Sequence, residues 1–216
     1  MLELCYYPLN ASMAVRFTLE KLGVPYKLTK IDRRHEQQKT EAYLALNPTG
    51  RIPTLIDGDL ALFESAAISL YLVSAYSQGA STAKLVPRDI AQRAKFDQWL
   101  MYLCNTLQSE LMVYLYPERY ADSRELEKII CDSAELRINE MLELLNRQLA
   151  NSNYLLGQEL SICDYFLFML SVWADELSKP PLSYDHLAPY LKRLARYPEI
   201  QTVCINEHLN LEPYLN

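Results

Sequence analysis

Residues 47–55 read Asn47-Pro48-Thr49-Gly50-Arg51-Ile52-Pro53-Thr54-Leu55, a loop that leads into an apolar strand opened by Pro53. Proline cannot donate to a β-ladder, so a proline at the start of a strand is an ordinary feature of a sheet edge. A cis-proline at the same place would expose the backbone groups of Ile52 for pairing with an extended ligand. The sequence leaves both interpretations open.

Beyond this loop the chain continues as a hairpin and then a helix. Two apolar runs, residues 54–56 and 60–63, are separated by Asp57-Gly58-Asp59. Asp-Gly between apolar runs is a strong hairpin signal. Residues 65–76 then carry apolar side chains at helical spacing.

Upstream of the loop, short strand patterns alternate with helix patterns. Residues 2–7 and 26–31 are typical of strands, and residues 11–22 of a helix that ends at Gly23. A short helix is expected over 40–46. The resulting order, β-α-β-α-β-β-α, predicts a mixed sheet with helices packed on its faces.

The second half of the chain carries helical patterns only. Ser161 and Asp164 form an S-x-x-D capping box that is expected to begin a central, buried helix. Small polar residues at 77–82 are the best linker candidate. We therefore expect an α/β domain over 1–77, a linker over 78–87 and an all-helical domain over 88–216. The other expected helices cover residues 88–114, 124–150 and 187–196.

Composition narrows the classes of protein that need consideration. The 216 residues are 50% hydrophobic, which is enough for a sizeable core, and the net charge of -6 argues against nucleic acid or an anionic membrane as partner. Five cysteines without a C-x-x-C pair and three histidines without zinc-ligand spacing predict neither a disulfide framework nor a metal site. Without a basic leader or a long apolar run, the chain is expected to be soluble and cytoplasmic.

Two junctions between strand and helix patterns have the chemistry of a binding site. Residues 6–12 enter the first helix, and Glu64-Ser65 open the helix over 65–76. A helix N-terminus favours an anion, and the adjacent Glu64 carboxylate favours a cation, so together they suit an amino-acid zwitterion. The plainer interpretation at each junction is a helix cap, provided by Asn10 or Ser12 at the first and by Ser65 at the second.

The motifs together resemble those of one family. Tyr6-x-Pro8, Asn47-Pro48-x-Gly50-x-Ile52-Pro53, Glu64-Ser65 and Ser161-Ile162-x-Asp164 occur in the order found in glutathione S-transferases, most of all in the bacterial beta-like members. The resemblance covers essentially the whole chain. It implies a thioredoxin-like α/β domain followed by an all-α domain, glutathione as co-substrate, and a homodimer.

The resemblance also implies roles for individual residues. Ile52, before a cis-Pro53, would pair its backbone with the cysteinyl part of glutathione, while Glu64 and Ser65 would hold the γ-glutamyl ammonium and carboxylate. Arg51, or the basic stretch 33–35, would bind the glycine carboxylate. The residues that would line a pocket for the electrophile, unless they are ordinary core residues, are Tyr102, Gln108, Met112 and Tyr116.

The sequence departs from the family pattern at the sulfur-facing end. Ala11 stands where beta-like members often carry cysteine, Gln108 replaces a histidine, and Met101 replaces a polar residue. One hydroxyl or amide donor lowers a thiol pKa by about one to two, since a hydrogen bond to a charged group contributes about 1.5–3 kcal/mol. The candidate donors, in order of preference, are Ser12, Asn10, Tyr6 and the backbone around Ala11.

Two functions from different classes follow. The first is an enzyme that stabilises the glutathione thiolate and transfers it to a hydrophobic electrophile. A variant, reduction of disulfides or peroxides, is not favoured because no cysteine stands at position 11. The second is a non-catalytic binding or regulatory protein with the same fold, like the stringent starvation proteins that act on RNA polymerase.

Overall fold

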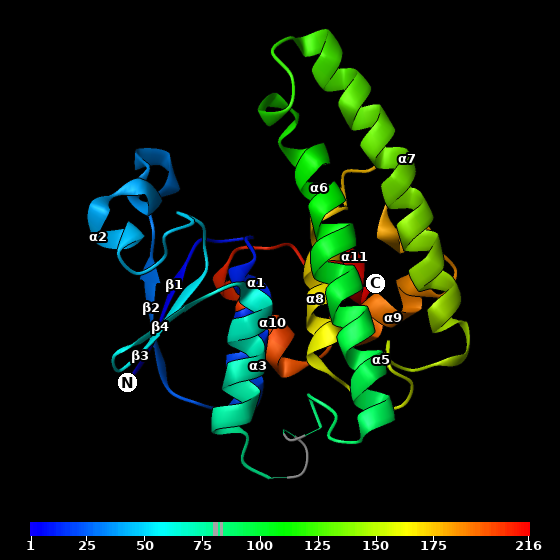
Figure 1. Ribbon diagram of the computed structural model, residues 1–216. Coiled ribbons are helices and arrows are strands. Elements are labelled where there is room, and N and C mark those ends of the chain that lie inside the picture. Colours follow the sequence, from blue (N-terminus) through cyan, green and yellow to red (C-terminus); the bar gives the residue numbers. More distant parts are fainter. Residues whose placement is uncertain (80–81, 83) are drawn as a thin grey trace. The chain divides into compact units, whose positions relative to one another are not determined.

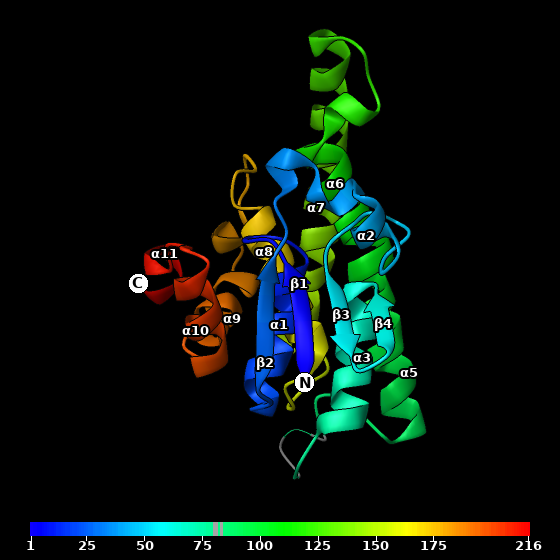
Figure 2. The same cartoon turned by 90° about the vertical axis from the view of Figure 1, so that its left-hand side faces the viewer.

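The computed structural model describes residues 1–79, 82 and 84–216. In it, strands from the N-terminal part of the chain form one four-stranded mixed sheet (Figure 1). The strand order is β2 (Tyr26–Lys30), β1 (Leu2–Tyr6), β3 (Thr54–Asp57), β4 (Leu60–Phe63). β1 pairs with β2 in parallel and with β3 antiparallel, and β3 pairs with β4 antiparallel. Figure 2 shows the four strands side by side, which confirms the predicted mixed sheet.

The predicted hairpin is present. Asp57 pairs with Leu60, so the turn consists of Gly58 and Asp59. Gly58 has a φ of 59°, in the left-handed region that glycine enters without a steric penalty. The Asp-Gly signal therefore marked a turn that depends on this glycine.

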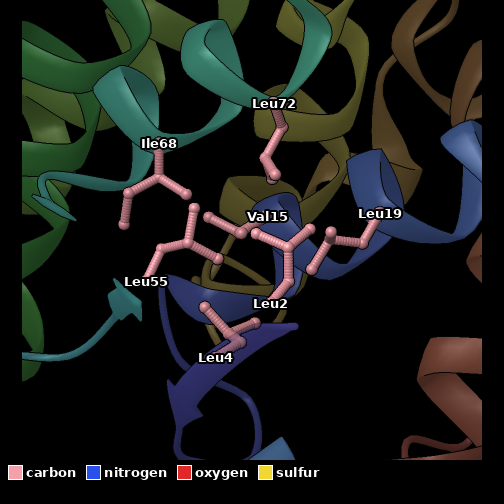
Figure 3. Packing of buried hydrophobic residues seen from close by; sticks show 7 residues of the cluster. All are labelled: Leu2, Leu4, Val15, Leu19, Leu55, Ile68 and Leu72. Atoms are coloured by element: carbon pink, nitrogen blue, oxygen red, sulfur yellow. The ribbon is translucent and has the colours of Figure 1, made fainter. Parts of the chain in front are cut away.

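The larger hydrophobic core lies between one face of the sheet and two helices, α1 (Ser12–Leu22) and α3 (Ser65–Tyr76). Gly23, at φ 67°, ends α1 and donates its N–H to the carbonyls of Glu20 and Leu19, as the sequence predicted. Full burial of each aliphatic side chain contributes about 1.5–3 kcal/mol. Figure 3 shows the cluster, in which strand and helix residues point toward one another: Leu2, Leu4, Val15, Leu19, Leu55, Ile68 and Leu72.

A smaller cluster lies apart from the main one. The short helix α2 (Glu41–Leu44) contributes Tyr43, which packs against Cys5 of β1, Ile31 and Ile52. All four side chains are buried. Because Ile52 belongs to this cluster, the Pro53 loop is fixed to the sheet by apolar contact as well as by the chain.

The structure divides into two compact units, and each is described by itself. The first comprises Met1–Val86 and Tyr197–Leu211, and the second comprises Pro87–Arg196 and Glu212–Asn216. The expected all-helical domain over 88–216 differs from this division, because residues 197–211 join the first unit. The expected linker over 78–87 includes residues 80, 81 and 83, which lie outside the described residues.

Helix α10 (Pro198–Asn206) is the reason for that difference, because it packs against α1 of the first unit. The sequence predicted that Pro198 ends the helix over 187–196, and that helix, α9 (Leu187–Leu194), does end before it. Pro198 also begins α10, at a position where a helix has no use for the missing N–H. A helix after Pro198 was not predicted.

The second unit is helical. The expected helix over 88–114 is interrupted by a π-helical stretch at Tyr102–Leu107. Helix α8 (Ile162–Trp173) is buried along most of its length, as predicted for the central helix. In the described part of the chain, no helix combines the length and apolar character needed to cross a membrane. The α-helices of the second unit are α5 (Ile90–Met101), α6 (Gln108–Leu115), α7 (Arg124–Gln148), α8 (Ile162–Trp173), α9 and α11 (Glu212–Leu215).

The predicted capping box begins α8. The Asp164 carboxylate accepts from the Ser161 N–H at 2.7 Å and from the Ser161 hydroxyl at 3.0 Å. It also accepts from the Leu155 N–H at 2.9 Å and from the Tyr190 hydroxyl at 2.7 Å. Burial raises the pKa of Asp164, against the effect of these donors. One carboxylate thus joins the start of α8 to a loop and to α9.

Candidate functional site

The register of the sheet brings the predicted junctions to one end of it. Cys5, near the end of β1, pairs with Thr54 at the start of β3, and Thr54 pairs with Phe63 at the end of β4. The residues after β1, before β3 and after β4 therefore share this end. We call these residues, 6–12, 50–53 and 64–65, the sheet-end site.

The Pro53 loop has the form that the family resemblance implied. The Ile52–Pro53 peptide bond is cis. Pairing of β3 begins at Thr54, so Ile52 lies before the paired residues. The backbone of Ile52 is thus placed at the edge of the ladder, where an extended ligand would add to it.

Two buried side chains that the sequence analysis did not assign hold this loop. The Tyr43 hydroxyl donates to the Arg51 carbonyl at 2.7 Å, and Asn47 Nδ2 donates to the same carbonyl at 2.8 Å. Asn47 also donates to Thr54 Oγ1 and accepts from the Thr49 N–H. Asn47 is 1% exposed, so its place in the motif is explained by these bonds within the loop.

Lys39 lies beside the loop as well, and it was missed. A Cβ placed on Gly50 would lie 2.9 Å from Lys39 Nζ and 3.1 Å from the Gln38 carbonyl oxygen. Gly50 also has a φ of 60°, a backbone conformation in which a residue with a side chain is strained. The Lys39 ammonium therefore lies next to the turn that precedes Arg51.

The basic stretch over 33–35 is engaged elsewhere. Asp32 accepts from the backbone N–H groups of Arg34 and His35, and its carboxylate lies 2.7 Å from His35 Nδ1. This contact raises the pKa of His35 and lowers that of Asp32. The Arg33 guanidinium carbon lies 5.3 Å from the centroid of the Tyr7 ring. Local contacts thus engage these residues.

Glu64 and Ser65 occupy the start of α3. Glu64 is exposed and has a φ of 69°, a conformation that costs a residue with a side chain about 1–3 kcal/mol. Ser65 is 8% exposed, and among the described residues no group accepts a hydrogen bond from its hydroxyl. Strained backbone conformations such as that of Glu64 cluster at active sites and ligand-binding sites. The first helical N–H groups and the Ser65 hydroxyl are thus placed for an anion, next to an exposed carboxylate.

Ser12, the first-ranked thiol donor, has a structural role. It is fully buried, and its hydroxyl donates to the Tyr7 carbonyl at 3.0 Å. The Ser12 hydroxyl proton, which a thiolate would need as its hydrogen-bond donor, is therefore already bonded to the Tyr7 carbonyl. The structure gives no support to Ser12 as donor.

Asn10 is better placed. Its Oδ1 accepts from the Ala11 N–H at 2.7 Å, which fixes the side chain and occupies that backbone donor. The side chain is half-buried, and no acceptor for its Nδ2 lies among the described residues. An orientated amide donor is thus available at the start of α1.

Tyr6, the third candidate, packs against the core under α1 and α3. Its ring centroid lies 5.3 Å from the guanidinium carbon of Arg16. The tyrosine ring is thereby committed to packing and to a cation–π contact.

The candidate electrophile-pocket residues all belong to the second unit. Tyr102 lies in the π-helical stretch, donates to the Met141 carbonyl at 3.4 Å and meets Trp99 edge to face. Burial raises its pKa. Gln108 and Met112 are half-buried on α6, and the Tyr116 ring lies 4.0 Å from the guanidinium carbon of Arg119. Their assignment to a pocket remains a prediction.

Comparison with known proteins gives the family to which this chain belongs. Residues 4–74 match the family described as glutathione S-transferase, N-terminal domain, and residues 105–198 match its C-terminal domain. The chain belongs to the glutathione S-transferase family. It is 33% identical over 164 residues to glutathione S-transferase F10 of Arabidopsis thaliana, covering 74% of each chain. It is 26% identical over 211 residues to glutathione S-transferase GstA of Escherichia coli O157:H7, covering 96% of this chain and 100% of the relative.

Solved structures confirm the predicted fold, a thioredoxin-like domain with a helical domain. A glutathione S-transferase from Xylella fastidiosa superimposes with a TM-score of 0.88 at 24% identity, over 97% of this chain and 100% of that one. A glutathione transferase homolog from Sulfitobacter, solved with bound glutathione, superimposes with a TM-score of 0.86 at 23% identity, over 97% and 99%.

Proposed function

We propose that this chain is a glutathione transferase that binds glutathione at the sheet-end site and transfers its thiolate to a hydrophobic electrophile. The observation that carries the proposal is the register, which places the Ile52 backbone and the Glu64-Ser65 pair at the same end of the sheet. An extended tripeptide needs backbone pairing in its middle and charge recognition at its amino-acid head, and these residues have that chemistry.

The far end of the tripeptide carries the glycine carboxylate. Lys39 Nζ lies against Gly50, and Arg51 follows in the same loop. Two cations beside the Ile52 backbone suit a carboxylate better than the stretch over 33–35, which is engaged with Asp32 and Tyr7. We therefore assign the glycine carboxylate to Lys39 and Arg51.

At the thiol end we assign the donor role to Asn10 Nδ2. In Asn10→Ala, the pKa of the bound thiol is expected to rise by about one to two, since a hydrogen bond to a charged group contributes about 1.5–3 kcal/mol. At a pH below the raised thiol pKa of the variant, less of the bound glutathione is thiolate than in the wild type. At alkaline pH the thiolate fractions of the two proteins converge. The measurement is the ultraviolet thiolate absorbance of bound glutathione against pH, with the free protein subtracted.

Two further variants make this test specific. Asn10→Asp keeps an acceptor for the Ala11 N–H but removes the donor, so its thiol pKa should rise at least as far. Ser12→Ala should leave the thiol pKa unchanged, because the Ser12 proton already serves the Tyr7 carbonyl. A shift in Ser12→Ala without one in Asn10→Ala would return the role to Ser12.

The proposed enzyme acts as a homodimer. Supporting evidence is an apolar stripe on α7, opposite its buried face, formed by Leu126, Ile129, Leu136 and Leu144. Ile129 is 57% exposed and Leu136 is 69% exposed. Sedimentation should give twice the chain mass for the wild type and the single mass for Ile129→Glu/Leu136→Glu. An unchanged mass in the double variant would place the interface elsewhere.

The proposed location is the cytoplasm. The five cysteines are all free thiols in the structure, which fits a reducing compartment.

Burial raises the pKa of Cys5 to about 11 and that of Cys204 to about 12. These two thiols are therefore protonated at neutral pH and take no part in the proposed transfer.

A further inference from the structure

A buried carboxylate from the C-terminal part of the chain contacts the loop between β1 and α1. Glu207 directly follows α10, and its side chain is 0% exposed. One carboxylate oxygen lies 2.7 Å from Arg16 Nη1 of α1, and the other accepts from the Leu9 N–H at 2.6 Å. All three residues belong to the first unit.

The Leu9 contact ties the loop between β1 and α1 to a residue outside it, whereas the other hydrogen bonds of this segment are local. Leu9 is 43% exposed and has a φ of 55°, a left-handed conformation that costs about 1–2 kcal/mol for a residue with a side chain. The next residues are Asn10 and Ala11, at the thiol end of the sheet-end site. A charge-assisted bond to Glu207 gives this conformation a partner from outside the loop.

Stability alone is a weak explanation for such a pair. Replacing a buried ion pair by apolar residues is often neutral or stabilising, because both charges must leave water. In addition, Arg16 Nε is buried without a partner. The Arg16 guanidinium lies over the Tyr6 ring and also pairs with the carboxylate that faces Leu9.

We propose that Glu207 is a positioning residue for thiolate formation, which holds Leu9 so that the Asn10 amide faces the glutathione sulfur. The proposal rests on the function proposed above. It makes residues at the far end of the chain part of the thiol-activating machinery, although Glu207 itself contacts neither sulfur nor electrophile.

The sign of the effect separates positioning from simple electrostatics. In Glu207→Gln, the loss of a negative charge beside an unneutralised Arg16 would by itself favour thiolate and lower the thiol pKa. Loss of positioning raises it. The other titratable groups near the pair include Tyr6 of β1, whose ring centroid lies 5.3 Å from the Arg16 guanidinium carbon, Tyr26 of β2 and Cys204 of α10. Burial raises the pKa of Tyr26 and that of Cys204 to about 12, so these two stay neutral across the range tested.

The experiment is a double-mutant cycle on the full chain. The pKa of the bound thiol is measured in the wild type, Glu207→Gln, Asn10→Ala and the double variant, alongside the affinity for glutathione by calorimetry. Glu199→Gln is the matched control, because Glu199 pairs with Lys21 at 3.2 Å and joins α10 to the opposite end of α1. Circular dichroism and Tm verify that each variant is folded.

We expect Glu207→Gln to raise the thiol pKa by about one, with glutathione affinity within about twofold of the wild type. Glu199→Gln should leave the thiol pKa unchanged, and the double variant should match Asn10→Ala. If Glu207→Gln does not fold, Glu207→Asp replaces it, since its charge still faces Arg16 but its side chain is one methylene too short for Leu9.

Three results would overturn the proposal: a thiol pKa in Glu207→Gln that is unchanged or lowered, an equal shift in Glu199→Gln, or additive shifts in the double variant. Failure of the proposed function is seen separately. In that case the wild type itself gives no heat with glutathione, or its bound thiol titrates like free glutathione, and the positioning proposal is overturned with it.

Discussion

Ser65→Ala and Glu64→Ala are each expected to weaken glutathione binding by about 10- to 100-fold, measured as Kd by calorimetric titration. Ser65 contributes a buried hydroxyl with no acceptor among the described residues, and Glu64 an exposed carboxylate next to it. Each variant removes one of the two groups that recognise the amino-acid head of the tripeptide. The remaining helical N–H groups still attract the carboxylate, so binding weakens without vanishing.

The control for this prediction is Ser74→Ala, an exposed serine on the same helix. Its affinity for glutathione should equal that of the wild type. If the wild type gives no heat at millimolar glutathione, the non-catalytic binding protein becomes the better hypothesis. If Ser65→Ala binds as tightly as Ser74→Ala, the tripeptide head lies elsewhere.

Asp164→Ala should lower the free energy of unfolding by about 3–5 kcal/mol, the largest effect on stability that we expect. The fully buried carboxylate accepts from the Leu155 and Ser161 N–H groups and from the Ser161 and Tyr190 hydroxyls. Alanine leaves all four donors buried without an acceptor. Denaturant titration followed by circular dichroism measures the change.

Asp132→Ala is the matched control. Asp132 pairs with Lys128 across one turn of α7 and its side chain is 61% exposed, so its loss should change stability by no more than about 0.5 kcal/mol. Asp164→Asn keeps an acceptor of the same shape and should fall between the two. A loss below about 1 kcal/mol in Asp164→Ala would contradict the role assigned to this carboxylate.

Local patterns predicted most of the fold because each depends on residues close together in the chain. The Asp57-Gly58 turn, the Gly23 helix end and the Ser161–Asp164 box are satisfied within a few residues. Alternating strand and helix signals then left few ways to build the sheet. The helix after Pro198 was missed because a proline that ends one helix also begins another.

The site was harder to predict where contacts join distant residues. Glu207 and Leu9 are 198 positions apart, and no local pattern connects them. The sequence showed Asn47 in a motif but did not predict its role. Its hydrogen-bond partners are backbone and hydroxyl groups that become neighbours only in the folded loop. Ser12 is a candidate donor by residue type, but the sequence could not show that its hydroxyl donates to the Tyr7 carbonyl in the fold.

The assignment of Tyr197–Leu211 to the first unit has a consequence for biosynthesis. A ribosome delivers β1 and the loop after it early, yet the Glu207 carboxylate that contacts Leu9 is added 198 residues later. Until Glu207 has been added, the Arg16 guanidinium of α1 lacks this carboxylate partner. A truncation before Glu207 would accordingly leave the loop between β1 and α1 without the carboxylate that contacts it.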